Sequence, residues 1–258
     1  MKGQDMDRQD KADTCSERTL TYGRQKSAIR QLFEYGKTRA QEIGADKVFD
    51  FSIGNPSVPP PALVASAFKT LLENEDPITL HGYTSAPGDP TVRTAIADQL
   101  NRDYGTDYGP NDLYLTCGAA AALSSTFRAL TLEGQANDFI VPAPYFPEYK
   151  CFVEGHGGRL LSVLSDLPDL GLPLEAMEKA ITSSTRAVII NSPNNPSGKL
   201  YGKDELAALG RLLTEKSQVY GQPIYLVSDE PYRELVYEGL LSPFIPHIYP
   251  DTIVCYSY

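Results

Sequence analysis

Positive charge is scarce in this sequence of 258 residues. It has 23 lysine and arginine residues against 33 aspartate and glutamate residues, which gives a formal net charge of −10. Proteins that bind nucleic acids or anionic membranes present basic patches to the phosphate groups. The charge balance therefore argues against both kinds of partner.

Long apolar runs are missing too. No run approaches the roughly 20 residues that would span a bilayer. Residues 1–20 are charged and lack the apolar centre of a secretory signal. We expect about ten residues at the start to be disordered. The sequence is typical of a cytoplasmic protein that does not bind membranes.

Clustered metal ligands are the third absence. His81, His156 and His247 stand alone, and the four cysteines are scattered without a CxxC pair. Zinc sites need closely spaced ligands, so we expect no metal site. Cys117 and Cys255 lie in apolar segments, and we expect both to be inert, buried thiols.

Short apolar runs of strand length are present. They cover residues 48–53, 112–115, 139–141, 159–164, 186–190, 224–227 and 252–256. Several are continuous rather than alternating, which is typical of strands covered on both faces. Helical periods lie between them, as at Val92, Ile96 and Leu100 and in the leucine-rich segment after Gly202. This alternation predicts an α/β fold, a three-layer sandwich around a mostly parallel sheet.

Residues 1–45 have a different pattern. One long amphipathic helix is predicted around Ile29–Ile43, and Gly44 follows it. We expect this N-terminal helical arm to pack on another part of the molecule or on a partner subunit. Residues 46–258 would then form the large domain.

In open α/β sheets, ligands bind beyond the carboxyl ends of the strands. After the strand predicted at 112–115, Gly118 permits a tight turn and a helix begins at about Ala119. A helix that starts after a glycine turn offers free main-chain N–H groups, which suit a phosphate. A plain turn is the alternative.

Two more strand ends carry candidate ligand contacts. The segment PAPYFPEY follows residues 139–141, and its prolines and aromatic residues could hold a ring flat against a planar ligand or cap the sheet. The segment NSPNNPSGKL follows residues 186–190. There Asn195, fixed by Pro196, either offers an amide donor to a ligand or belongs to an ordinary turn.

The strand predicted at 224–227 runs into the segment SDEPYRELVY. A buried carboxylate is costly unless a cation or hydrogen bonds compensate it. Asp229 therefore lies at a solvated rim or meets a positive group, whereas Glu230 is expected to be solvated or structural. Together, the four strand ends suit a phosphorylated, planar, nitrogen-containing ring that bears a hydroxyl group.

These motifs, in this order, resemble the large domain of the class I and II aminotransferases, which are fold-type I pyridoxal-phosphate enzymes. The resemblance runs from about Phe51 to Tyr258. It is carried by FSIGNPSVPPP, GYTSAPGDPTVRTAIA, CGAAAAL, PAPYFPEY, NSPNNPSG, SDEPYRELVY and CYSY. It implies pyridoxal 5′-phosphate as cofactor, an amino acid and a 2-oxo acid as substrates, and a homodimer with shared active sites.

The resemblance also implies roles around the cofactor ring. Asp229 matches the aspartate that pairs with the pyridine nitrogen, and it keeps that nitrogen protonated. Tyr232 and Asn195 match the groups that hydrogen-bond the ring's phenolic oxygen, and Asn195 is also a substrate-binding candidate. Phe146, rather than Tyr145, matches the aromatic residue that stacks on the ring.

Other matched residues concern the phosphate and the substrate. Gly118, Ala119 and Ala120 match the phosphate cradle, where many relatives place a serine or threonine, and Ser257 matches a serine that contacts the phosphate. Gly54 matches a glycine whose main chain meets the substrate's α-carboxylate. Tyr83 matches a tyrosine that reaches the phosphate of the neighbouring subunit, although the residues alone favour an ordinary surface aromatic.

In the family, a lysine forms a Schiff base with the cofactor aldehyde and follows the pattern Ser-aromatic-Ser-Lys. This sequence reads CYSY at residues 255–258, and no lysine within it occupies that place in the pattern. We expect the lysine two residues beyond Tyr258, in a natural protein longer by on the order of 100 residues or more. The 258 residues alone should then be inactive.

Three functions remain open from the sequence. The first is an aminotransferase, and the second is a carbon–sulfur β-lyase, because the same ring chemistry supports both. A lyase would release pyruvate and ammonia without a 2-oxo acid, whereas a transferase needs one. The third is a non-catalytic, aminotransferase-like sensor domain. The acidic charge and the short residues 1–45 argue against it, since such regulators carry a DNA-binding module there.

Overall fold

The computed structural model describes residues 15–24, 28–54 and 58–258. The predicted disordered start lies outside these residues. The chain forms two compact units, Met1–Thr84 and Ser85–Tyr258. The domain boundary predicted between residues 45 and 46 stays a prediction.

The first unit is helical. Its helices are α1 (Glu17–Arg24), α2 (Ala28–Ile43), η2 (Ala45–Lys47), α3 (Ala62–Asn74) and α4 (Pro77–Leu80). Helix α2 confirms the amphipathic helix predicted in the arm. The strand predicted at 48–53 was wrong, because those residues form coil and bends. A strand needs a hydrogen-bonded neighbour, and no other strand is described in this unit.

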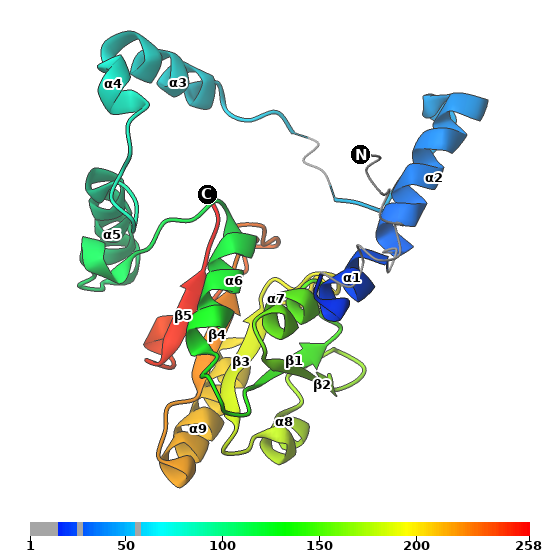
Figure 1. Ribbon diagram of the computed structural model, residues 1–258, viewed down its shortest axis with the longest axis vertical. Coiled ribbons are helices and arrows are strands. Elements are labelled where there is room, and N and C mark those ends of the chain that lie inside the picture. Colours follow the sequence, from blue (N-terminus) through cyan, green and yellow to red (C-terminus); the bar gives the residue numbers. More distant parts are fainter. Residues whose placement is uncertain (1–14, 25–27, 55–57) are drawn as a thin grey trace, which may run out of the picture. The chain divides into compact units, whose positions relative to one another are not determined.

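The second unit holds a five-stranded sheet (Figure 1). Its strands are β1 (Asp138–Ala143), β2 (Arg159–Leu164), β3 (Thr185–Asn191), β4 (Tyr225–Asp229) and β5 (Thr252–Cys255). They lie in the order β2-β1-β3-β4-β5, and every neighbouring pair is parallel. The predicted α/β sheet is confirmed.

One predicted strand of this unit, at 112–115, was wrong. Residues Pro110–Asp112 form the short helix η3, and the segment after them pairs with no strand that the structure describes. Leu115 instead donates its main-chain N–H to the carbonyl oxygen of Pro87 at 2.9 Å. An apolar run without a partner strand gains no ladder hydrogen bonds, so its β propensity is not realised.

The helices of the second unit lie between the strands in sequence. They are α5 (Pro90–Tyr104), α6 (Ala119–Leu130), α7 (Tyr149–Gly155), α8 (Leu174–Ala180), α9 (Lys203–Tyr220) and η4 (Ile245–His247). Local signals fix their ends. The Asp89 side chain accepts the N–H groups of Thr91 and Val92, and Gly221 ends α9 in the left-handed region with φ 66°.

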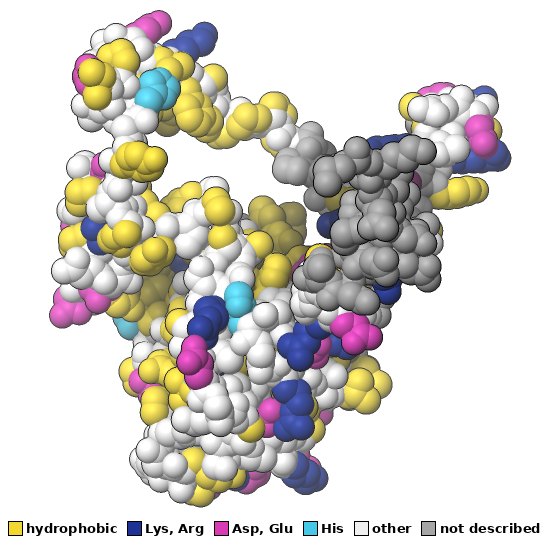
Figure 2. All heavy atoms as spheres, viewed as in Figure 1, with side chains coloured by type: hydrophobic (Ala, Val, Ile, Leu, Met, Phe, Trp, Pro, Cys, Tyr) yellow, Lys and Arg dark blue, Asp and Glu magenta, His cyan; other side chains and the backbone are white. Residues whose placement is uncertain are grey.

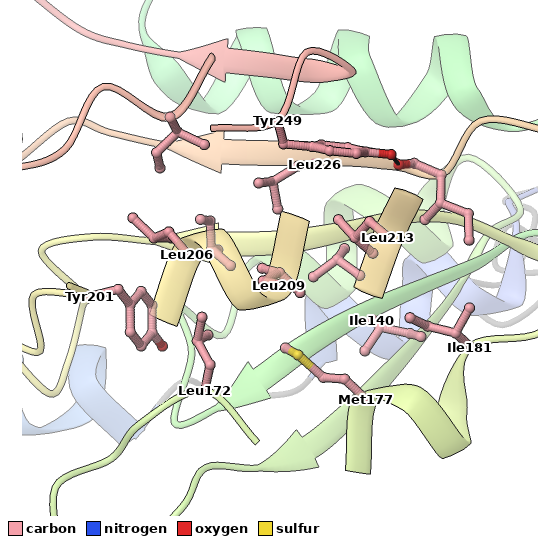
Figure 3. Packing of buried hydrophobic residues seen from close by; sticks show 14 residues of the cluster. Ile140, Leu172, Met177, Ile181, Tyr201, Leu206, Leu209, Leu213, Leu226 and Tyr249 are labelled. Carbon is pink, nitrogen blue, oxygen red and sulfur yellow. Dashed lines mark hydrogen bonds between the residues drawn. The ribbon is translucent and has the colours of Figure 1, made fainter. Parts of the chain in front are cut away.

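The sheet is covered on both faces, which makes three layers (Figure 1). Alternate strand residues point to opposite sides. Ile140, Val188 and Leu226 face α8 and α9, and Figure 3 shows Met177 and Leu209 packed on this side. The other face packs on α6 and α7 through a second buried cluster: Leu123, Phe127, Phe139, Val141, Tyr149, Val153, Ala187, Ile189, Val227 and Cys255. This double coverage explains why the strands read as continuous apolar runs.

The cysteine prediction was half right. Cys255 is buried at the end of β5, as predicted, but Cys117 is exposed. Cys117 lies in the unpaired segment that precedes α6, where no neighbouring strand covers it. Among the described helices, none combines the length and the apolar character needed to cross a bilayer. The described residues also contain no cluster of three or more metal-ligating side chains.

Candidate active site

Asp229 is the last residue of β4 and is 5% exposed. It pairs in register with Asn191 of β3 on one side and with Cys255 of β5 on the other. The hydroxyl of Tyr149 donates a hydrogen bond of 2.5 Å to Asp229 Oδ2. The other carboxylate oxygen, Oδ1, is buried and has no hydrogen-bond partner among the described residues. A solvated rim is therefore excluded, and the carboxylate lacks a donor on one side.

The electrostatics of Asp229 follow from this burial. The pKa of its carboxyl group is raised to about 6, mainly by burial; the hydrogen bond from Tyr149 lowers this pKa, and the charge of the adjacent Glu230 raises it. In turn, burial and the neighbouring Asp229 raise the pKa of the Tyr149 hydroxyl far above its ordinary range. Tyr149 therefore stays a neutral donor. Native structures leave few buried carboxylate oxygens unpaired, which marks Oδ1 as a binding atom.

Asn191 connects the ends of β3 and β4. Its side-chain amide donates to the main-chain carbonyl oxygen of Asp229 at 2.8 Å, and its Oδ1 accepts the main-chain N–H of Asn195 at 2.5 Å. The Asn195 amide in turn approaches the Tyr232 hydroxyl at 3.5 Å, the outer limit of a hydrogen bond. The structure thus brings together Asp229, Asn195 and Tyr232, three residues that the sequence placed in one site.

Gly118 forms the turn before α6. Its φ of 92° and ψ of 169° suit glycine, and no side chain caps the helix. An added Cβ there would meet no atom within 4 Å, so the space beside the turn is open. The first N–H groups of a helix lack intrahelical acceptors, and Ala119 and Ala120 occupy those positions. Gly118 and Ser257 line one cavity of about 780 Å³.

The aromatic rings of PAPYFPEY gather around Tyr149. The Phe146 ring meets the Tyr149 ring edge-on at 5.6 Å, and the Tyr145 ring lies parallel to it at 6.4 Å. Both Phe146 and Tyr145 are half-buried against the cluster on the α6–α7 face. The assignment of Phe146 rather than Tyr145 as the stacking residue stays a prediction, because both rings lie next to Tyr149, which donates the hydrogen bond to Asp229.

Replacing Phe146 with alanine should weaken binding of pyridoxamine 5′-phosphate by about 1–2 kcal/mol, roughly tenfold, the scale of a lost aromatic contact. Tyr145→Ala is the matched control and should cost less, because both rings flank Tyr149 but only Phe146 is assigned to stack on the ligand. Fluorescence titration of the two variants measures the difference. A larger loss in Tyr145→Ala would move the stacking role to that residue.

Glu230 is not solvated, which corrects one of the two expectations for it. It is 1% exposed, accepts the Ser228 hydroxyl at 2.6 Å, and accepts the Nε–H of Arg233 at 2.5 Å. A second guanidinium nitrogen of Arg233 also contacts the same carboxylate oxygen. A buried carboxylate needs such compensation, and the sequence did contain the signal: an arginine three residues after the acid.

Two residues of the site were not predicted from the sequence. Tyr149 was counted among the aromatic residues of PAPYFPEY without a role, and Asn191 was treated as part of a turn. Tyr149 comes from a helix 80 residues away from Asp229 in sequence, so no spacing rule connects the two. Asn191 had a usable signal, because it is the last residue of a strand that neighbours β4.

Comparison with known proteins agrees with this geometry. The family model "Aminotransferase class I and II" matches residues 46–258. The chain belongs to the class I and II aminotransferases. An amino transferase structure from Eubacterium rectale superposes with a TM-score of 0.91 at 50% identity, covering 95% of this chain and 61% of that one. The Thermus thermophilus aspartate aminotransferase with maleate gives 0.79 at 29% identity, covering 93% and 59%.

Sequence relatives agree with this family. The aspartate/prephenate aminotransferase of Thermus thermophilus is 38% identical to this chain over 159 residues, which cover 61% of this chain and 39% of that protein. The aspartate aminotransferase of Streptomyces avermitilis is 29% identical over 216 residues, 83% of this chain and 50% of that protein. The chain thus spans about half of their length or less. Class I and II aminotransferases use pyridoxal phosphate, so the cofactor expected from the motifs is confirmed.

The residues present fit that cofactor. A protonated pyridine nitrogen would supply the donor that Asp229 Oδ1 lacks, and it would offset the cost of burying the carboxylate. The open space at Gly118, beside a helix start, suits a phosphate. Gly54 and Tyr83 lie in the first unit, where Tyr83 is fully exposed, and their roles stay predictions.

Proposed function

We propose that pyridoxal phosphate binds at the carboxyl ends of β1, β3, β4 and β5. Asp229 would hold the pyridine nitrogen, and Asn195 with Tyr232 would hold the phenolic oxygen. Phe146 would cover the ring. At the other end, the N–H groups of Gly118, Ala119 and Ala120, together with Ser257, would hold the phosphate.

In this proposal, the bound cofactor supplies a ring that accepts electrons when a substrate's Cα–H bond breaks. Asp229 keeps a proton on the ring nitrogen because its ionised carboxylate stabilises the positive charge. Tyr232 and Asn195 donate hydrogen bonds that stabilise the anionic phenolic oxygen. Burial around Asp229 excludes water, which strengthens each of these charge interactions.

The activity that this site supports best is transfer of an amino group from an L-amino acid to a 2-oxo acid. The observation that carries it is the buried Asp229 with one unpaired oxygen, beside the Asn195–Tyr232 pair. A relative at 38% identity is named an aspartate/prephenate aminotransferase and one at 29% an aspartate aminotransferase, so L-aspartate is the first amino acid to test. A cytoplasmic location belongs to the same proposal, because the four cysteines are free thiols.

The test is incubation of the full-length protein with pyridoxal phosphate and a panel of L-amino acids, with and without 2-oxo acids. Formation of a new amino acid that depends on the 2-oxo acid supports the transferase. Release of pyruvate and ammonia without a 2-oxo acid would replace it with the β-lyase. If the chain does not bind pyridoxamine 5′-phosphate, the site assignment itself is wrong.

We further propose a homodimer in which the first unit packs on a second copy. None of the side chains described in residues 15–84 is buried. Helix α3 exposes Leu63, Phe68 and Leu72 by 63–75%, and Figure 2 shows apolar side chains on the surface of this helix. Soluble proteins rarely leave such a face uncovered. Its occupant in this proposal is another copy of the chain, with Tyr83 reaching that copy's phosphate.

Replacing Phe68 and Leu72 with serine should shift the protein toward a monomer, because each substitution removes apolar area from the proposed interface. The control is Leu164→Ser, a leucine on β2 of the second unit that is more exposed than Phe68 and Leu72. Sedimentation at several concentrations reports the mass. An unchanged dimer in the double variant, or a monomeric wild-type protein, contradicts the interface.

A further inference from the structure

Arg233 directly follows Tyr232 in the turn after Asp229, and its side chain is 9% exposed. Its Nε donates to Glu230 Oε2, and a second nitrogen contacts the same oxygen. The guanidinium carbon also lies 4.7 Å from the centre of the Tyr256 ring, 5.8 Å from that of Tyr104 and 5.9 Å from that of Phe244. One arginine thus meets a buried carboxylate and three aromatic rings.

These contacts come from separate elements. Tyr104 ends α5, Phe244 precedes η4, and Tyr256 follows β5 directly before Ser257. The rings of Tyr104 and Phe244 stack at 4.0 Å with an angle of 9°. Arg233 therefore joins the turn after β4, which carries the proposed ring contacts, to the segment after β5, which carries a proposed phosphate contact. Arginine suits this role because its planar group stacks and pairs at once.

We propose that Arg233 is a positioning residue that neutralises Glu230 and so leaves Asp229 free to ionise against the cofactor ring. This inference rests on the proposed cofactor site. Arg233 makes none of the proposed cofactor contacts itself. It acts through Glu230, which is next to Asp229 in sequence, is buried like it, and raises the pKa of Asp229 by its charge.

The charge balance around Asp229 explains why this matters. The titratable groups that interact with its carboxylate are Tyr149 from α7, Cys255 from β5 and Glu230 from its own segment. None of these three is a cation. A Glu230 without its arginine would add a full, buried negative charge beside Asp229. Ionisation of Asp229 would then become more costly, since like charges disfavour each other's charged form.

The first test measures Asp229 without any ligand. Carboxyl-carbon NMR titration should give a higher pKa for Asp229 in Arg233→Met than in the wild-type protein. The double variant Arg233→Met/Glu230→Gln should bring the pKa of Asp229 back to the wild-type value or below it, because it removes the charge of Glu230 together with Arg233. It also keeps the test valid where Arg233→Met alone folds poorly.

The matched control is Arg186→Met. Arg186 is also 9% exposed, but it lies near the amino end of β3 and bonds to the neutral side chains of Asn137, Gln222 and Gln135. Its loss should lower stability and leave the pKa of Asp229 unchanged. Equal pKa values for Asp229 in Arg233→Met and in the wild-type protein would overturn the proposal, as would a failure of Glu230→Gln to reverse the rise.

The second test uses pyridoxamine 5′-phosphate. Arg233→Met should weaken its binding about tenfold at pH 7, and the double variant should regain most of the loss. Arg233→Lys keeps the charge but not the planar stacking, so it should retain the wild-type pH dependence. If wild-type protein does not bind the ligand while the NMR result holds, the proposed cofactor site fails and the charge coupling stands. If the ligand binds equally to all variants, the positioning role fails.

Discussion

Asp229→Asn should make the ligand-free protein more stable at pH 7.5 and should abolish high-affinity binding of pyridoxamine 5′-phosphate. The carboxylate is buried, and Oδ1 has no partner among the described residues, so its charge costs free energy until a cation arrives. Asparagine keeps the shape and still accepts the Tyr149 hydroxyl. It cannot stabilise a protonated ring nitrogen.

The pH dependence follows from the sign of the shift. The pKa of Asp229 is raised to about 6 in the folded protein, mainly by burial, from about 3.9 in an unfolded chain. The folded state therefore holds the proton more tightly, and stability falls as the pH rises from about 4 to about 6. Above that range the cost is fully present, about 1–3 kcal/mol. Asparagine should remove it.

Thermal unfolding at pH 7.5 and pH 4.5 measures this effect. The melting temperature of Asp229→Asn should exceed that of the wild-type protein by about 3–9 °C at pH 7.5, and the gap should narrow at pH 4.5. Asp138→Asn is the control. Asp138 is a strand carboxylate of similar burial, but Arg159 pairs with both its oxygens at 2.8 Å, so its loss should lower stability. If the melting temperature of Asp229→Asn is lower than that of the wild-type protein at both pH values, the ionised Asp229 carboxylate does not destabilise the folded protein.

The sequence predicted the fold well where strands have partners. All five strands of the sheet were predicted from apolar runs, and β1, β3 and β4 are buried along most of their length, as continuous runs indicate. Residues 48–53 and 112–115 carry the same kind of run, yet neither forms a strand. A strand also needs a neighbouring segment with which it can form hydrogen bonds, and an apolar run alone does not show whether such a segment lies beside it.

The site divides in the same way. Asp229 and Asn195 follow predicted strands that the structure contains, so the rule that ligands bind at the carboxyl ends of strands is enough to select them from the sequence. Gly118 was selected by the same rule, although the strand predicted before it does not form. The residues that contact Asp229 or influence its ionisation could not be predicted from the sequence. Tyr149 reaches it from α7, and Arg233 acts through Glu230 and rings of three other elements. Local spacing cannot encode contacts that depend on how elements pack.

Tyr149→Phe should therefore change the ionisation of Asp229 strongly. The Tyr149 hydroxyl makes the one side-chain hydrogen bond that the described residues give to the Asp229 carboxylate, and this bond lowers the pKa of Asp229. A hydrogen bond to a charged group contributes about 1.5–3 kcal/mol. Without it, the pKa of Asp229 should rise above 6, and much of the carboxyl group should be protonated at neutral pH.

The consequence is a shift in the pH dependence of ligand binding. The complex pairs an ionised Asp229 with a protonated ring nitrogen, so the affinity for pyridoxamine 5′-phosphate should fall below about pH 6 in the wild-type protein. In Tyr149→Phe this fall should begin at higher pH, and the affinity at pH 7 should drop by roughly ten- to a hundredfold, as expected for a lost bond of that size. Calorimetric titration between pH 5 and 8.5 measures both curves.

Tyr145→Phe is the matched control. Its ring lies parallel to the Tyr149 ring at 6.4 Å, so the substitution removes a hydroxyl from the same aromatic cluster without touching the donor to Asp229. It should leave the pH dependence unchanged. If Tyr149→Phe and Tyr145→Phe give the same curve as the wild-type protein, the hydrogen bond to Oδ2 does not control the ionisation of Asp229. In that case burial alone sets the charge of this site.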